Sequence, residues 1–301
     1  MKKKCAYLGP PGTFSELAVI NYCTGKDEEI IPYDSIRELV EAVNKNEVDI
    51  ALLPLENSLE GSVNISLDLL FENEGVEILK ELVLPIEHFL LTPEKKSITE
   101  IKTVYSHPQA IAQSEKFLSS KMPQAKLLST ESTAAAAKKV AEDKKGAAIG
   151  SFRLAEIYDL EITASNLEGE LPNTTRFVII GRSKKFVSSQ NNTDAGQKKR
   201  CKTSIICTPK KNRAGVLHDI LGEFARREID LSRIESRPTR KKLGEYMFYI
   251  DLAGNLEDKN LKKSLKEVEK KSGYFRILGS YQVVKLLSQK EKKLKKTEVL
   301  Q

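Results

Sequence analysis

A hydroxyl and a guanidinium stand side by side at Thr175 and Arg176, where a polar loop becomes an apolar strand. The apolar run at 177–180 is typical of a buried strand, and Pro172 with Asn173 is typical of the turn before one. Threonine can hydrogen-bond to a departing oxygen, and arginine offers a cationic fork for a carboxylate. A bare Thr-Arg-Phe is more often a strand start with a surface arginine, so the rest of the chain must decide.

Three further polar loops follow predicted strands, at 4–8, 48–53 and 103–105. The first loop is glycine-rich with capping-box spacing, which predicts an anion-accepting helix start or a plain helix cap. Ligands of parallel α/β sheets bind beyond the carboxyl ends of the strands, so we expect these loops to build one site. Their candidate side chains are Thr13, Ser15, Glu56, Asn57, Ser58 and Ser106, together with His107 as an acid or a loop-shaping residue.

Composition excludes several classes of protein. The 301 residues, 40% hydrophobic and 30% charged, indicate a soluble protein with about two domains. The net charge of +7 comes from residues 184–202, with six Lys/Arg and one Asp, and from residues 288–301, with five Lys and two Glu. The rest of the chain has no basic stripe, so the sequence gives no indication of nucleic-acid binding. No apolar stretch approaches the roughly 20 residues of a membrane span, and the apolar run after the first lysines is too short for a signal peptide.

Four cysteines and three histidines complete the exclusions. The cysteines show no Cys-x-x-Cys spacing and the histidines are scattered. We therefore expect no metal knuckle, no redox pair and no histidine-based triad, and we interpret the cysteines as reduced thiols of a cytoplasmic protein.

The chain divides at a polar segment. Residues 184–202, rich in Ser, Asn, Gln and charge, predict a linker. Upstream, in residues 1–183, strand-like and helical runs alternate, which predicts an α/β domain with mostly parallel sheets. Downstream, in residues 203–287, the order is βαββαβ, the pattern of an α+β ferredoxin-like domain, before a basic tail at 288–301.

The motifs together resemble bacterial monofunctional prephenate dehydratases, which carry a C-terminal ACT regulatory domain. The resemblance covers about the first 182 residues and independently the second half. It rests on the stretches 9–15, 54–63, 106–113, 132–135, 147–151, 173–177, 215–221 and 235–238. Departures are Ala214 and Val216 in the Gly-Ala-Leu region, and Glu168 or Glu170 where an Asp usually precedes Asn-x-Thr-Arg-Phe.

The resemblance implies a two-lobed catalytic domain similar to a periplasmic binding protein. One lobe would hold residues 1–78 and 172–182, and the other residues 79–171. The implied reaction, on the path to phenylalanine, removes carbon dioxide and water from prephenate to give phenylpyruvate, without cofactor or metal. Thr175 would hydrogen-bond the departing hydroxyl, by itself or with a proton relayed from water or Glu56. Arg176 would neutralise the pyruvyl carboxylate or order Glu56 and the adjoining loops. The side chains that would orient the substrate are Thr13, Ser15, Asn57, Ser58, Ser106 and Asn173, and Glu56 would also contact it.

The same resemblance implies inhibition by L-phenylalanine and a homodimer or homotetramer. The effector would bind where one subunit meets the next, and its expected contacts are Asn212, Ala214, Gly215, Val216, Leu217, Glu235 and Ser236. Two alternatives stay open. An arogenate dehydratase would act on the analogue with an amine in place of the keto group, and an amino-acid sensor would use the same fold without catalysis.

Overall fold

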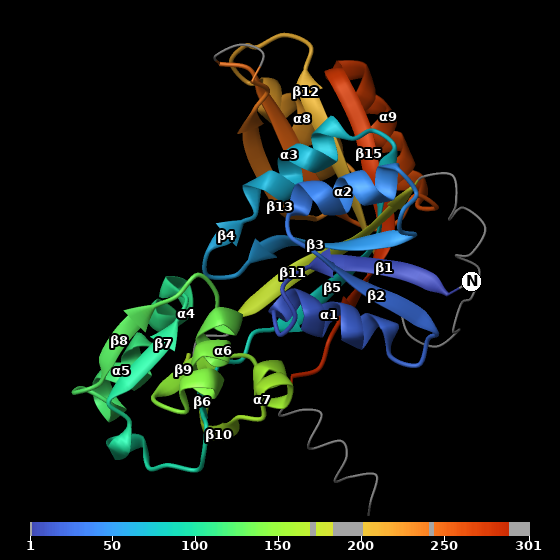
Figure 1. Ribbon diagram of the computed structural model, residues 1–301. Helices are drawn as coiled ribbons and strands as arrows, with labels where there is room; N and C mark the ends of the chain where they lie inside the picture. The colour runs from blue at the N-terminus through green and yellow to red at the C-terminus, as the bar shows by residue number, and fades with distance from the viewer. Residues whose placement is uncertain (1, 169–172, 183–200, 241–243, 289–301) are drawn as a thin grey trace, which may run out of the picture.

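Two β-sheets organise the protein, and the computed structural model describes residues 2–168, 173–182, 201–240 and 244–288. The larger sheet runs through the first lobe and the whole carboxy-terminal domain, whereas the smaller sheet forms the second lobe (Figure 1). The predicted two-lobed α/β domain, followed by a βαββαβ domain, is therefore confirmed. No helix in these ranges is long and apolar enough to cross a bilayer.

The first lobe mixes parallel and antiparallel strands. Its elements are β1 (Lys3–Leu8), α1 (Phe14–Cys23), β2 (Glu28–Tyr33), α2 (Ile36–Asn44), β3 (Ile50–Asn57), β4 (Gly61–Ser62), α3 (Asn64–Glu72), β5 (Val76–Pro85) and β11 (Thr174–Arg182). β1 pairs in parallel with β2 and β3, but β11 is antiparallel to β3 and β5. The prediction of mostly parallel strands is wrong here, because β11 returns from the second lobe and enters the sheet from the opposite end.

Helix α2 shows how the lobe buries its core. Ser35 caps the helix by accepting a hydrogen bond from the Glu38 amide. The apolar side chains that follow recur at helical spacing, so one face of the helix packs against the sheet. The buried residues of that face are Ile36, Leu39, Val40 and Val43.

The second lobe is built on a five-stranded sheet in the order β10-β6-β9-β7-β8. Its elements are β6 (Phe89–Thr92), the 3-10 turn Ile98–Glu100, β7 (Thr103–Ser106), α4 (Pro108–Gln113), α5 (Glu115–Lys121), β8 (Lys126–Ser129), α6 (Thr133–Asp143), β9 (Ala147–Gly150), α7 (Phe152–Tyr158) and β10 (Glu161–Ser165). Because β5 stays paired in the first sheet as far as Pro85, the chain crosses between lobes after residue 85, and the predicted crossing near residue 78 is wrong.

The carboxy-terminal domain contains β12 (Cys201–Pro209), α8 (Val216–Ala225), β13 (Leu231–Pro238), β14 (Tyr246–Ala253), α9 (Lys259–Lys271) and β15 (Ser272–Lys285). β12 begins at Cys201, so the last two residues of the predicted linker belong to a strand. The rest of that predicted linker, and the predicted tail from residue 289, lie outside the described residues.

The two domains share one sheet. β15 pairs in parallel with β5, through Gln282–Lys285 and Lys80–Val83, and this joins them into a continuous ladder. One hydrophobic cluster contains residues of both domains, including Leu67 and Leu70 beside Tyr249 and Leu278. A linker at 184–202 predicts few buried contacts between the domains that it joins. That prediction is wrong, because the outer edge of β5 would stay unpaired without β15.

Candidate active site

Thr175 lies where the first-lobe sheet faces the second lobe. β11 pairs with β3 so that Thr175 is opposite Asn57, and the Asn57 amide donates to Thr175 Oγ1 over 2.9 Å. Since this contact occupies Thr175 as an acceptor, its hydroxyl hydrogen is directed elsewhere and can be donated to a substrate oxygen. The geometry thus leaves Thr175 with a hydroxyl hydrogen to donate, and the donation of that hydrogen to substrate stays a prediction.

Asn57 uses all its hydrogen-bonding positions within the protein. Its amide also donates to Asn173 Oδ1 over 2.8 Å, and its own oxygen accepts from the amides of Leu59 and Glu60. A side-chain amide with two donors and two acceptor positions engaged is fixed in one orientation. The prediction that Asn57 binds substrate is not supported, because Asn57 has no hydrogen-bonding position left for a ligand and instead holds Thr175.

Asn173 connects this cluster to the second lobe. Its side chain is buried and donates to Gln113 Oε1 at the end of α4 over 3.0 Å. The Gln113 amide reaches Glu60 Oε1 over 3.5 Å. Gln113 belongs to the 106–113 motif but was not predicted as a site residue, and its side chain ties the two lobes together beside Thr175.

The glycine-rich loop after β1 is a second contact between the lobes. Glu16 accepts from the Gly12 amide over 2.7 Å, and Ser151 donates to the Gly12 carbonyl over 2.7 Å. Gly12 has a φ of 90°, and a Cβ there would lie 2.2 Å from Leu154, so only glycine fits. Arg153 approaches Glu16 at 3.5 Å, which brings a cation to this loop.

Thr13 and Ser15 begin helix α1 at the same edge as Thr175. Thr13 donates to the Leu8 carbonyl and accepts from the Glu16 amide, so it is a helix cap. Ser15 is 7% exposed. Ser58 accepts from the Thr174 amide over 3.0 Å and so fastens the loop after β3 to β11. The structure brings these loops together but uses Thr13 and Ser58 for local hydrogen bonds.

Ser106 lies inside the second lobe and away from the contacts between the lobes. Its side chain is fully buried and donates to the Ile149 carbonyl over 2.7 Å, which ties β7 to β9. The prediction that Ser106 binds substrate is therefore wrong. The adjacent His107 caps α4, because its Nδ1 accepts from the Gln109 amide.

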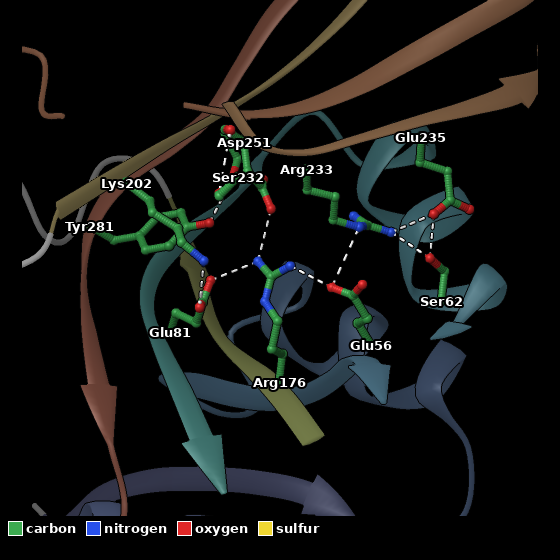
Figure 2. Close-up of polar contacts among 11 residues, drawn as sticks. Glu56, Ser62, Glu81, Arg176, Lys202, Ser232, Arg233, Glu235, Asp251 and Tyr281 are labelled. Atoms are coloured by element: carbon green, nitrogen blue, oxygen red, sulfur yellow. Dashed lines mark hydrogen bonds and ion pairs between the residues drawn. The ribbon is translucent and has the colours of Figure 1, made fainter. Parts of the chain in front are cut away.

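Glu56 and Arg176 lie on the other side of the sheet from Thr175. Arg176 contacts Glu56 at 2.5 Å, Glu81 at 2.7 Å and Asp251 of the carboxy-terminal domain at 2.8 Å (Figure 2). Neighbouring side chains of a strand point to opposite faces, so this result follows from the pleat of β3 and β11. Arg176 contacts Glu56 and orders it, which was one of the two roles expected for Arg176. The prediction that Glu56 and Arg176 bind substrate is wrong. The predicted proton relay from Glu56 to Thr175 is wrong as well.

A buried histidine beside the cleft was not predicted as a site residue. His88 is 2% exposed, its backbone amide donates to Glu168 Oε1 over 2.8 Å, and its Nδ1 lies 3.9 Å from the same oxygen. Burial lowers the pKa of His88 to about 4, and burial raises the pKa of Glu168. The neutral imidazole packs edge-on against Phe14 of α1 and connects both crossings between the lobes.

Among the described residues, one set of side chains brings potential metal ligands together, at the end of β1 far from the Gly12 loop. Cys5, Cys23 and Glu28 place their ligand atoms within 4.8 Å of one another. Cys5 donates to Glu28 over 3.1 Å, and its hydrogen bond with Cys23 and its burial raise the pKa of the Cys5 thiol. The raised pKa keeps the Cys5 thiol protonated, so we interpret this cluster as a hydrogen-bonded group of the core.

The predicted effector residues lie on the carboxy-terminal domain. Gly215 caps α8 with a φ of 79°, and the exposed Asn212 donates to the Gly244 carbonyl. Side chains alternate along β13, so Glu235 and Ser236 point to opposite faces. Glu235 contacts Arg233 on the same strand and Ser62 of the first lobe, while Ser236 is exposed. Glu235 is thus engaged with the catalytic domain within its own chain. Ala214 is exposed, and Val216 and Leu217 are partly buried.

The fold and site define a two-lobed α/β domain with polar side chains where the lobes meet, fused through one sheet to a regulatory-type domain. The prephenate dehydratase family model matches residues 5–185, and the ACT domain model matches residues 211–270. The chain is 41% identical to the prephenate dehydratase of Lactococcus lactis over 287 residues, which cover 94% of this chain and 99% of that protein. It therefore belongs to the prephenate dehydratase family.

Solved structures agree with this assignment. The prephenate dehydratase from Arthrobacter aurescens, in complex with L-Phe, is 31% identical with a TM-score of 0.80, over 92% of this chain and 89% of that one. GqqA, described as a novel type of quorum quenching acylase, is 28% identical with a TM-score of 0.79, over 93% and 98%. Since one fold carries both descriptions, the reaction must be argued from the site.

Proposed function

We propose that the protein is a prephenate dehydratase that acts as a carbon-oxygen lyase. The observation that carries this proposal is the Thr175 hydroxyl, held as an acceptor by Asn57 and free to donate toward the cleft. In the reaction the ring carboxylate leaves as carbon dioxide, its electron pair enters the ring, and hydroxide departs from the opposite carbon and takes a proton to become water. Aromatisation drives the step, so the protein needs to bind the dianion and stabilise the departing oxygen.

Thr175 is the donor that meets the developing hydroxide. Charge grows on that oxygen only in the transition state, so a hydrogen bond placed there raises turnover more than it raises substrate affinity. The first turn of α1, beside Arg153, offers backbone amides and a cation to a substrate carboxylate. Arg176 contributes indirectly, since its guanidinium is engaged by three carboxylates on the other face.

We propose further that L-phenylalanine regulates the enzyme through the ACT domain, in a homodimer or homotetramer of the cytoplasm. The match to the ACT model and the L-Phe complex of the Arthrobacter aurescens protein support the effector. The amides at the start of α8, after Gly215, suit the carboxylate of an amino acid. The exposed β13 edge suits pairing with a second copy, and the four free cysteines suit a reducing compartment.

The deciding experiment is incubation of the purified protein with prephenate and, in parallel, with arogenate. Phenylpyruvate is measured by its absorbance in alkali, and phenylalanine by chromatography. We expect turnover of prephenate to exceed that of arogenate. A preference for arogenate would assign the alternative substrate, and no turnover of either would leave a binding protein on this fold.

A further inference from the structure

A buried ion-pair network joins the two domains (Figure 2). It lies on the face of β11 opposite to that of Thr175. Arg176 lies at its centre and contacts Glu56, Glu81 and Asp251. The side chains of Glu81 and Asp251 are 1% and 5% exposed, so these charges are shielded from water. Asp251 comes from β14, and the ACT domain therefore supplies one of the three carboxylates that hold Arg176.

Asp251 is itself fixed by its own domain. Ser204 on β12 donates to Asp251 Oδ1 over 2.5 Å, and the Ser204 hydroxyl also contacts Tyr281 on β15. Burial alone would raise the pKa of Asp251, but the Arg176 charge, the hydrogen bonds from Ser204 and Arg176, and the Arg233 charge together outweigh burial, so this pKa lies below its ordinary value. An oriented and ionised carboxylate thus meets the guanidinium from the ACT side.

Arg176 is coupled to Thr175 by the backbone of β11. The pair Arg176 with Glu56 and the pair Thr175 with Asn57 are successive rungs of the same β11–β3 ladder. The register of that ladder shifts between Arg176 and Phe177 and resumes at Phe177 opposite Pro54, so Arg176 lies at a β-bulge directly beside the rung of Thr175. Any displacement of Arg176 is passed to Thr175 on the opposite face.

We propose that Asp251 is a positioning residue for the dehydratase reaction, so that the ACT domain completes the active site of the same chain. This inference rests on the proposed function. Asp251 holds Arg176, and Arg176 fixes the strand that presents the Thr175 hydroxyl. The active site is therefore not complete within residues 1–182.

The test is Asp251→Asn in the full-length protein, with Asp68→Asn as the matched control. Asp68 is another carboxylate at the same domain interface, but it contacts Arg237 and Arg240 and not Arg176. We expect Asp251→Asn to lower kcat about tenfold with KM changed by less than about twofold, because the lost geometry matters in the transition state. Asp68→Asn should keep kcat near the wild-type value. The melting temperature of each variant is measured alongside.

If Asp251→Asn does not fold, Ser204→Ala decides, since it removes the hydrogen bond that orients Asp251 and keeps the charge; kcat should then fall about threefold. If the wild-type protein turns over prephenate and Asp251→Asn has the same kcat, this inference is overturned while the proposed function stands. An equal loss in Asp68→Asn overturns it too, because the effect would belong to the interface in general. A wild-type protein without prephenate turnover rejects the proposed function and this inference together.

Discussion

Replacing Thr175 by valine tests the proposed chemistry most directly. Valine keeps the branched shape and removes only the hydroxyl. The Asn57 amide then loses the 2.9 Å hydrogen bond to Oγ1 but keeps its hydrogen bond to Asn173. The free energy of unfolding should therefore fall by about 1 kcal/mol. If the hydroxyl donates a hydrogen bond to the departing oxygen, kcat should fall by a factor on the order of 10² to 10³. This factor corresponds to about 3–4 kcal/mol of transition-state stabilisation.

The assay is steady-state formation of phenylpyruvate from prephenate. Thr175→Ser restores the hydroxyl and should retain much of the wild-type kcat, and KM should change little in both variants. Thr174→Val is the matched control, since it makes the same change one residue earlier in β11. A Thr175→Val enzyme with wild-type kcat, or a Thr174→Val enzyme with the same loss, would refute the assignment.

Gly215→Val should abolish the response to phenylalanine with basal turnover unchanged, because valine is strained at a φ of 79°; calorimetry on the wild type should show binding with a coupling of about 1–3 kcal/mol, and no binding would contradict the effector. A fragment of residues 1–183 should be far less stable to urea than the full chain, because it exposes the β5 edge and half of a shared core; equal stability would show independent folding. Burial lowers the pKa of His88 to about 4, so as pH falls the unfolded chain binds a proton before the folded protein does, and stability present at pH 7 is lost between about pH 6.5 and 4. His88→Gln should weaken this dependence of the free energy of unfolding in urea on pH. An unchanged slope would contradict the prediction.

Local patterns were sufficient for the elements that carry the site. The apolar run at 177–180 forms the buried part of β11, and the βαββαβ order of the carboxy-terminal domain is confirmed. The alternation of side chains along a strand also contained the information that Arg176 faces away from Thr175. Reading the two residues as one binding pair overlooked that period of two.

Contacts distant in sequence were not predictable in the same way. Pairing of β15 with β5 depends on which edges are left open, and no periodicity within either segment records that. Asp251 did leave a signal, since a carboxylate within the apolar run of β14 must be paired if that strand is buried. Its partner could be found only from the assembled sheet.

The shared sheet limits how an effector could influence turnover. An ACT domain joined to the first lobe by β-pairing and a common core is not free to rotate as a separate body. The start of α8 follows β12, and β12 carries Ser204, which orients Asp251 against Arg176. A change at α8 therefore has a continuous packed route through two strands to the rung that holds Thr175. Regulation along this route would change the geometry of the donor rather than open or cover the cleft, and would be seen in kcat more than in KM.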